Sequence, residues 1–186
     1  MERRVRAILS TSPGGPRTLL AAEVPDPEPA AGEVRVAVEA VGINYPDLLI
    51  IEDRYQYRPA RPFAPGGEIA GVVDAVGEGV EALRPGDRVL AFTGWGGLVE
   101  RVCLPAHKCH KVPDEMPSDE AAAFILTYGT SWHALGYRAR LAAGETLLVL
   151  GAAGGVGLAA VELGKALGAT VVAAASTRQK LDAALG

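Results

Sequence analysis

The pattern of apolar and polar residues changes character near residue 117. Before that point the apolar residues come in short alternating runs, and in EVRVAVEAVGI the residues Val34, Val36 and Val38 alternate with polar or small neighbours. A period of two is typical of a half-buried β-strand. Comparable runs, such as GEIAGVVDAVGEGV and RPGDRVLAF, are separated by glycine and proline turns. Many short strands between such turns predict a compact, barrel-like domain.

From Ser118 onward the pattern predicts helices that alternate with strands. Ser118 and the acidic residues after it mark the start of a helix. Farther on, TLLVL (Thr146–Leu150) has a strand pattern, a glycine-rich turn follows, and a helix pattern runs to about Leu167, where Gly168 stops it. TVVAAA is a second strand, and STRQKLDAALG begins another helix. A strand, a helix and a second strand in this order predict a parallel sheet.

Together the two patterns predict an α/β protein with two domains, residues 1–117 and residues 118–186. The net charge is −4 and the sequence has no basic cluster, which argues against nucleic acid or an anionic membrane as a partner. No apolar run reaches membrane-spanning length, and two cysteines provide no disulfide framework. We therefore expect a cytoplasmic enzyme or binding protein.

The glycine-rich turn predicts a dinucleotide site. Ala152, Gly154 and Gly157 fall on the G/A-x-G-x-x-G spacing directly after a strand pattern. In such a turn the first small residue permits a tight bend, the second lets a pyrophosphate approach, and the third lets the helix pack on the sheet. Gly155 and Val156, inside the turn, would meet the pyrophosphate at the helix N-terminus. Glycine-rich turns also occur without a ligand, so the prediction depends on the strands and helix around this one.

The residues after the second strand favour NADP over NAD. An NAD site usually has an acidic residue there, which binds the ribose 2′-hydroxyl. This chain has hydroxyl and basic side chains instead, which suit a 2′-phosphate; they are Ser176, Thr177, Arg178 and Lys180. In a purely structural interpretation Ser176 caps the next helix, and the two basic residues are solvated. Both interpretations can hold together.

Five stretches of the chain carry a family resemblance. They are VGINYPDLLIIEDRYQ, PFAPGGEIAGVVDAVGEGV, RPGDRVLAF, TYGTSWHAL and GAAGGVGLAAVELGKALGATVVAAAST. In this order they resemble the medium-chain dehydrogenase/reductases, specifically the zinc-free quinone oxidoreductase branch, and the resemblance runs from one end of the chain to the other. It implies a GroES-like β-barrel domain followed by a Rossmann domain, with the active site in the cleft between them. It also implies a homodimer in the full-length form.

The resemblance further implies that the reaction uses no zinc. Zinc-dependent members have a cysteine where this chain has Asn44, and a histidine where it has Gly67. The four-cysteine structural zinc lobe has no counterpart between Gly86 and Leu104. A rival zinc site would use the ligands clustered in CLPAHKCHKVP, which are Cys103, His107, Cys109 and His110. Their spacing differs from that of usual structural zinc sites, so we expect small buried cysteines there instead.

By the same resemblance, Asn44 and the segment after it, starting with Tyr45, line the nicotinamide side of the cleft. Tyr55 matches a family tyrosine that faces the substrate, where its phenol could donate a hydrogen bond or a proton. A structural interpretation makes Tyr55 a surface aromatic residue. Leu49 stands where some quinone reductases have a second tyrosine, and this departure favours a generic enone over quinone itself as the substrate.

Two further positions, Thr130 and His133 in TYGTSWHAL, match contacts to the nicotinamide end of the cofactor. They could equally be polar residues on a helix packed beside the barrel. Asp47 follows Pro46 and is expected to cap the LLII helix rather than to act as a general base.

A complete Rossmann sheet has six strands, and this sequence supplies only the first two. We therefore expect a Rossmann domain represented by its first half, in a chain that is part of a longer polypeptide. The function that the resemblance implies is NADPH-dependent, zinc-independent hydride transfer to a small-molecule quinone or activated enone. Two alternatives stay open: a non-catalytic NADP-binding or partner-binding remnant, and an enoyl reductase that acts on acyl thioesters.

Overall fold

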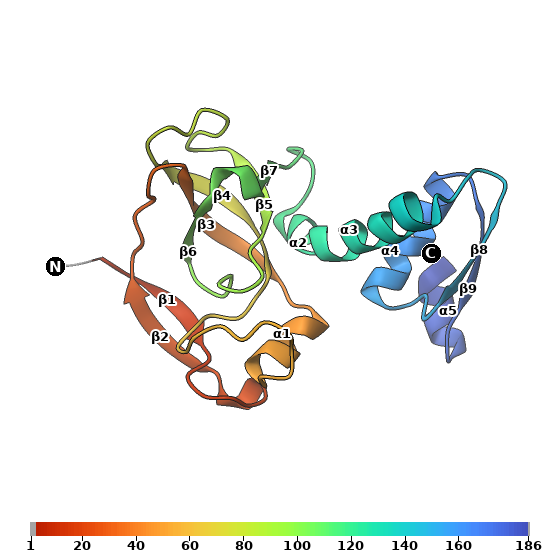
Figure 1. The fold of residues 1–186 in the computed structure, drawn as a ribbon, viewed down its shortest axis with the longest axis horizontal. Helices are drawn as coiled ribbons and strands as arrows, with labels where there is room; N and C mark the ends of the chain where they lie inside the picture. Colours follow the sequence, from red (N-terminus) through yellow and green to blue (C-terminus); the bar gives the residue numbers. More distant parts are fainter. Residues whose placement is uncertain (1–2, 186) are drawn as a thin grey trace. The chain divides into compact units, whose positions relative to one another are not determined.

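The structure is a computed structural model that describes residues 3–185. The first half of the chain forms two antiparallel sheets (Figure 1). In the smaller sheet β1 (Arg4–Leu9) pairs with β2 (Leu20–Pro25). The larger sheet has five strands in the order β6-β3-β4-β5-β7; they are β3 (Glu33–Gly42), β4 (Glu68–Val76), β5 (Arg88–Phe92), β6 (Arg101–Pro105) and β7 (Cys109–Lys111). Single 3₁₀ turns, η1 (Pro16–Thr18) and η2 (Ala106–Lys108), precede β2 and β7.

The core of this half lies on one face of the larger sheet. Val34 and Val36 of β3 are fully buried, and they pack with Ile69 and Val73 of β4 and with Val89 of β5. The alternation seen in the sequence is therefore the alternation of the two faces of β3. This confirms the predicted strand and the predicted strand-rich domain.

Two short helices complete this half. The first, α1 (Tyr45–Ile51), is separated from the end of β3 by two residues and has Pro46 in its first turn, where proline is favoured. The second, α2 (Ser118–Ala122), begins at Ser118 as predicted. It packs against β3 and β4, and Gly42 permits this approach because a Cβ there would lie 2.2 Å from the carbonyl oxygen of Ala122. Since α2 packs on this sheet, the first compact unit runs to Ala123 rather than ending at residue 117.

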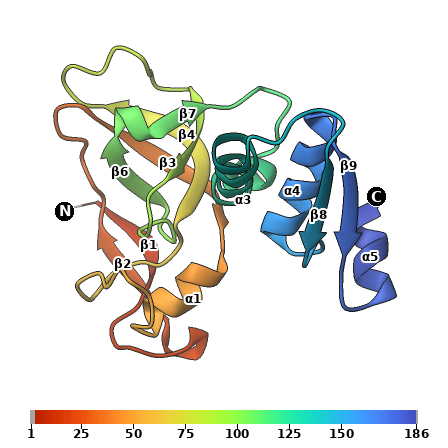
Figure 2. The same ribbon diagram turned by 45° about the vertical axis from the view of Figure 1, so that its right-hand side comes forward.

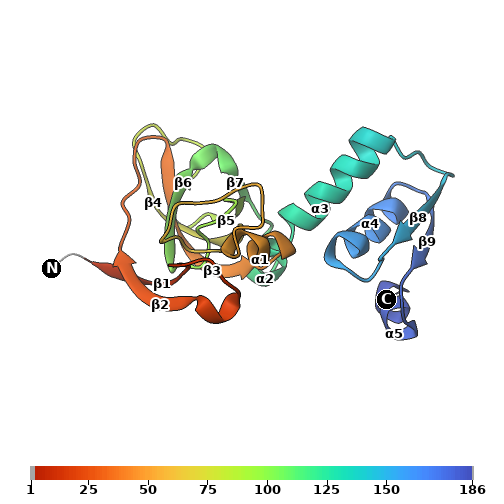
Figure 3. The ribbon, with the colours of Figure 1, turned by 60° about the horizontal axis from the view of Figure 1, so that its bottom comes forward.

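The second compact unit begins at Phe124. Its first helix, α3 (Ile125–Trp132), continues directly into a π-helix, η3 (His133–Ala139), and Figure 3 shows the two as one rod. Then follow β8 (Thr146–Leu150), α4 (Gly155–Ala166), β9 (Thr170–Ala174) and α5 (Arg178–Leu185). β8 and β9 are parallel, with Thr146 opposite Thr170, and α4 lies alongside them (Figure 2). The predicted strand–helix–strand unit is confirmed.

The two faces of the β8–β9 sheet differ in burial. On one face Val149 packs with Val161 of α4. The fit of α4 is close there, because a Cβ on Gly164 would lie 2.7 Å from the Leu147 side chain. On the other face Leu148 and Leu150 are exposed. In β8, residues facing α4 thus alternate with exposed residues, and α4 packs on one face of the sheet.

Candidate functional site

The glycine loop joins β8 to α4 by a tight bend. Gly151, the first residue after β8, has a φ of +70°, a conformation that favours glycine. The N–H of Ala152, which is fully buried, donates to the carbonyl of Ala174 at 3.0 Å and so ties the loop to the end of β9. Gly154 is the N-cap of α4, and its carbonyl accepts the N–H of Leu158 at 2.8 Å. The loop therefore ends at a helix N-terminus, where backbone N–H groups favour an anion.

Two motif glycines of the loop, Gly154 and Gly157, have different surroundings. A Cβ on Gly157 would lie 2.4 Å from the carbonyl oxygen of Gly151, so the loop backbone itself requires glycine there. A Cβ on Gly154 would meet nothing closer than 3.6 Å, and Gly154 is exposed. Packing within the protein therefore does not require glycine at 154. A ligand that approaches this backbone would require it.

A pocket of about 570 Å³ opens beside this loop. Its lining joins the loop to the end of β9 and the first turns of α5, and consists of Gly151, Ala153, Gly154, Ala174, Ala175, Ser176 and Lys180. The Lys180 ammonium donates to the Ser176 hydroxyl oxygen at 3.3 Å. Within this lining Lys180 supplies positive charge and no side chain is acidic. The structure thus brings together three of the predicted site residues, Gly154, Ser176 and Lys180.

Thr177 and Arg178 have other contacts. The Thr177 hydroxyl accepts the N–H of Lys180 at 3.3 Å, and its carbonyl accepts the N–H of Leu181 at 3.1 Å. Thr177 therefore caps α5, and the expectation that Ser176 caps this helix was wrong by one residue. Arg178 pairs with Asp182, one turn along the exposed surface of α5, at 2.9 Å. Neither residue belongs to the pocket lining.

Thr130 and His133 lie on the rod formed by α3 and η3, and both are exposed. The residue between them that reaches the glycine loop is Ser131, which is buried and whose hydroxyl donates to the carbonyl of Val156 at 2.9 Å. The His133 ring lies 6.0 Å from the ring of Tyr137. The helix that carries Thr130 and His133 therefore contacts the start of α4, but neither side chain lines the pocket.

In the first unit Asn44 lies at the N-terminus of α1 in a capping box with Asp47. The Asp47 carboxylate accepts the N–H of Asn44 at 2.7 Å and the N–H of Gly66 at 3.2 Å. Burial raises the pKa of Asp47, and the hydrogen bonds from the backbone of Asn44, Gly66 and Gly67 partly offset that effect. Asp47 therefore belongs to the capping box of α1 and also ties the helix to the turn before β4, but the N-cap residue is Asn44, whereas the sequence had suggested Asp47.

The Asn44 side chain contacts a residue that the sequence analysis did not select. Its amide nitrogen donates to the carboxylate of Glu68 at 2.7 Å. Glu68 opens β4 opposite Gly42, and it is 1% exposed. A signal for it exists in the sequence, because a charged residue that opens an apolar strand pattern, as in GGEIAGVV, needs a polar partner once it is buried.

Asn44 is the N-cap of α1, whereas Tyr55 lies four residues beyond Ile51, the last residue of that helix. Tyr55 is half-buried against Ile50, Ile51 and Phe63, so it is more than a surface aromatic residue. Tyr45, at the start of the helix, is 71% exposed. Asn44 therefore caps the start of α1, and Tyr55 packs on the residues at its end.

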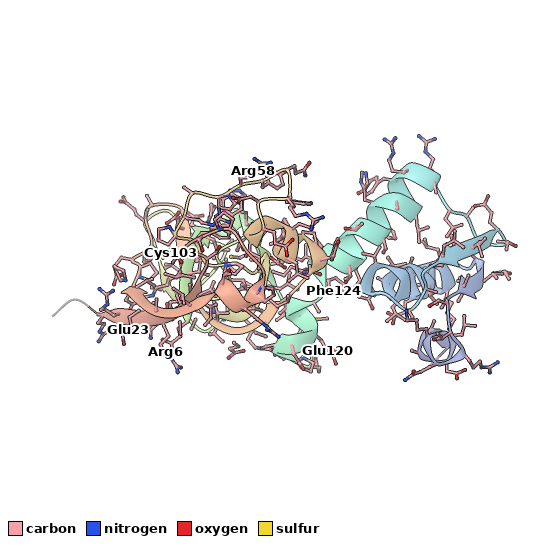
Figure 4. The ribbon with its side chains drawn as sticks, turned by 90° about the horizontal axis from the view of Figure 1, so that it is seen from below. Arg6, Glu23, Arg58, Cys103, Glu120 and Phe124 are labelled. Atoms are coloured by element: carbon pink, nitrogen blue, oxygen red, sulfur yellow. The ribbon has the colours of Figure 1, made fainter. Side chains whose placement is uncertain are left out.

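The stretch that would form a rival zinc site is divided between two strands. Cys103 lies in β6 (Figure 4) and Cys109 in β7, and these are the two edge strands of the larger sheet. Burial raises the pKa of each thiol to about 11, which favours the protonated form over the thiolate that binds zinc. Within residues 3–185 no three histidine, cysteine or acidic residues are grouped so that they could hold a metal ion.

Comparison with known proteins relates both units to one kind of enzyme. Residues 30–114 match the family model of the alcohol dehydrogenase GroES-like domain. The chain is 43% identical over 150 residues to the quinone oxidoreductase-like protein 2 homolog of Nematostella vectensis, a match that covers 80% of this chain and 41% of that protein. It is 38% identical over 180 residues to the quinone oxidoreductase of Lama guanicoe, a match that covers 96% of this chain and 54% of that protein.

Comparison with solved structures also finds a quinone oxidoreductase. The quinone oxidoreductase of Thermus thermophilus, which was also solved in complex with NADPH, aligns with a TM-score of 0.86 at 39% identity, over 97% of this chain and 56% of that one. The chain thus spans about half the length of the relatives that it matches. None of the helices in the described part of the chain is long and apolar enough to cross a membrane.

Proposed function

Because the chain belongs to the medium-chain dehydrogenase/reductase superfamily, in its quinone oxidoreductase-like branch, we propose that it binds NADPH and takes part in zinc-independent reduction of a quinone or an activated enone. The observation that carries the proposal is the pocket that joins the glycine loop to Ser176 and Lys180. Its two ends suit the two phosphate-bearing parts of the adenosine half of this cofactor.

At the first end, the N-terminus of α4 would hold the pyrophosphate. The exposed N–H groups of the first turn supply donors, and Gly154 leaves its backbone open because nothing in the protein fills the space of a Cβ. Ser131 supports this arrangement, since its hydrogen bond to Val156 joins α3 to the same helical turn.

At the second end, Lys180 and Ser176 would hold the 2′-phosphate of the ribose. The ammonium and the hydroxyl lie 3.3 Å apart and line the same pocket, so one phosphate oxygen could accept from both. The lining has no carboxylate to repel that phosphate or to bind a free 2′-hydroxyl. These two features support NADPH over NADH.

The substrate would be reduced in a site to which Asn44 and Tyr55 contribute. When bound, the nicotinamide supplies the hydride. The protein's own part is to orient the reactants and to donate hydrogen bonds to an oxygen that gains negative charge. The Asn44 amide and the Tyr55 phenol are donors of the required kind, and Asp47 is unsuited to be a base because its oxygens accept backbone N–H groups.

The proposal is tested first by binding. We expect the purified chain to bind adenosine 2′,5′-bisphosphate at least about tenfold more tightly than AMP, measured by isothermal titration calorimetry, since one charge-assisted hydrogen bond contributes about 1.5–3 kcal/mol. Equal affinities would overturn the choice of NADP, and binding of neither nucleotide would overturn the dinucleotide site.

Turnover then tests the substrate. NADPH oxidation is measured with a simple quinone, with an enone and with a crotonyl thioester. Reduction of the quinone or the enone supports the proposal. A preference for the thioester would favour an enoyl reductase, and nucleotide binding without any turnover would favour a non-catalytic binding protein.

Replacing the Tyr55 phenol tests its role separately. We expect Tyr55→Phe to leave nucleotide affinity unchanged and to lower turnover about tenfold or more, because the ring keeps its packing on α1 while the donor is lost. Tyr57→Phe, which removes an exposed phenol whose ring lies 5.8 Å from that of Tyr55, is the matched control and should keep wild-type turnover. Wild-type turnover in Tyr55→Phe would remove Tyr55 from the mechanism.

A further inference from the structure

Two buried carboxylates surround Asn44, and each holds a different part of it. Asp47, which is 5% exposed, accepts the backbone N–H of Asn44. Glu68, which is 1% exposed, accepts from the side-chain amide at 2.7 Å. The Asn44 side chain also accepts the N–H of Asp47 in the capping box. Its nitrogen end therefore faces Glu68, and its oxygen end faces the first turn of α1.

The position of Glu68 is itself firmly determined. It is the first residue of β4, a central strand of the larger sheet, and it lies opposite Gly42 on β3 and Phe92 on β5. Gly42 leaves the space that its carboxylate fills, because a Cβ on Gly42 would lie 3.1 Å from Oε2 of Glu68. A carboxylate held by the sheet in this way offers Asn44 an acceptor at a fixed place.

The chemistry of the contact decides which way the Asn44 amide faces. An amide can turn over and exchange its oxygen for its nitrogen, and both ends have nearly the same shape. A carboxylate only accepts hydrogen bonds, so it selects the nitrogen and repels the oxygen. We propose that Glu68 is a positioning residue that keeps the Asn44 amide in one orientation, so that a bound substrate or cofactor always meets the same donor and acceptor pattern. The functional part of this inference rests on the role of Asn44 in the proposed function.

A variant that keeps the hydrogen bond but removes this selection is Glu68→Gln. The glutamine amide can accept from Asn44 or donate to it, so Glu68 no longer selects an orientation, and only the capping-box contact with the Asp47 N–H still favours one. Because Asn44 is the only asparagine in the sequence, labelling the protein with ¹⁵N-asparagine gives one side-chain NH₂ signal pair. We expect one sharp, slowly exchanging pair in the wild type, and a broadened or doubled, faster-exchanging pair in Glu68→Gln. The matched control is Glu23→Gln, which changes an exposed carboxylate on β2 (Figure 4) and should leave the signal unchanged.

Activity supplies the second measurement. If half of the Glu68→Gln molecules hold the amide the wrong way round, turnover should fall at least about twofold, while nucleotide affinity for the separate adenosine pocket stays the same. In an Asn44→Ala background, Glu68→Gln should cause no further loss, because Glu68 acts through Asn44.

The outcomes separate the two proposals. An unchanged asparagine signal in Glu68→Gln would overturn the positioning role, and so would an equal loss of turnover with and without Asn44. If the wild type reduces no quinone or enone, the proposed function fails, while the asparagine signal still decides whether Glu68 orients the amide.

Discussion

At the scale of single residues, Lys180 and Arg178 are neighbouring cations whose side chains have different surroundings. They lie two positions apart on α5, and so about 200° apart around the helix. Lys180 lines the nucleotide pocket and contacts Ser176, whereas Arg178 pairs with Asp182 on the exposed surface. An exposed pair of this kind contributes little to stability, so both residues can be changed without unfolding the helix.

We therefore expect Lys180→Glu to weaken binding of adenosine 2′,5′-bisphosphate by about tenfold or more, because a carboxylate would replace the cation that faces the phosphate. AMP, which lacks that phosphate, should lose much less affinity. Arg178→Glu is the matched control, and its effect should be smaller than that of Lys180→Glu. Calorimetric titration of both variants checks this. Equal losses for the two nucleotides would contradict the assignment of Lys180 to the 2′-phosphate.

The two cysteines allow a test that depends on pH. Burial is the main cause that raises the pKa of Cys103 and of Cys109 from 9.0 to about 11. Below pH 9.0 each thiol should therefore react with a thiol reagent about a hundredfold more slowly than free cysteine, because the thiolate is the reactive form. Between pH 9.0 and 11 the thiols of the unfolded chain lose their protons while those of the folded chain keep them. The free energy of unfolding should therefore fall as the pH rises through this interval. The rate of reaction with the thiol reagent is measured on folded and on denatured protein. Equal rates in the two states would contradict the raised thiol pKa values.

At the scale of elements, the glycine loop combines a structural requirement with a space for a ligand. Gly151 provides the left-handed turn, Ala152 joins the loop to β9, and Gly157 lets the loop backbone pass close to α4. Gly154 has none of these structural roles, because a Cβ there would lie no closer than 3.6 Å to another atom. Among residues 3–185, no close contact therefore requires glycine at position 154.

This difference predicts opposite effects for two small substitutions. Gly154→Ala should leave the thermal midpoint almost unchanged and weaken nucleotide binding about tenfold or more, because its methyl group would occupy the space where the pyrophosphate approaches. Gly157→Ala should lower the thermal midpoint clearly, because its methyl group would lie 2.4 Å from a backbone oxygen. Scanning calorimetry measures the thermal midpoint of each variant, and calorimetric titration measures its nucleotide affinity. A Gly154→Ala variant that binds like the wild type would contradict the assignment.

At the scale of the whole molecule, the chain consists of two compact units with separate cores. Residues 1–123 contain a five-stranded sheet whose core includes Val34, Val36 and Ile69. Residues 124–186 contain a two-stranded parallel sheet with a smaller core around Val149 and Val161. Two strands with a small apolar core stabilise a fold much less than five strands do.

We therefore expect a fragment of residues 1–123 to fold by itself and to unfold in one cooperative transition, measured by circular dichroism on heating. A fragment of residues 124–186 should be marginally stable, and adenosine 2′,5′-bisphosphate should raise its midpoint if the pocket binds it. The undivided chain is the reference for both. An unfolded 1–123 fragment would show that its core depends on the rest of the chain.

Local features of the sequence determined much of this protein. The alternation around Val34 and Val36 identified β3, and the strand, glycine loop and helix from Thr146 to Leu167 were predicted almost residue by residue. The helix over LLII was also readable from the sequence, although its N-cap is Asn44 and not the expected Asp47. Periodicity, turn residues and caps act over a few neighbouring positions, so the sequence alone reveals them.

Contacts between distant residues were decided only by the tertiary structure. Asn44 and Glu68 are 24 positions apart and meet because Gly42, at the end of β3, is paired with Glu68, at the start of β4. Lys180 lines the pocket and Arg178 does not, and this difference depends on the rotation of α5 about its axis. The cap at Thr177 sets where that helix starts. Strand register and helix rotation are fixed by packing across the whole unit, which no short stretch of sequence contains.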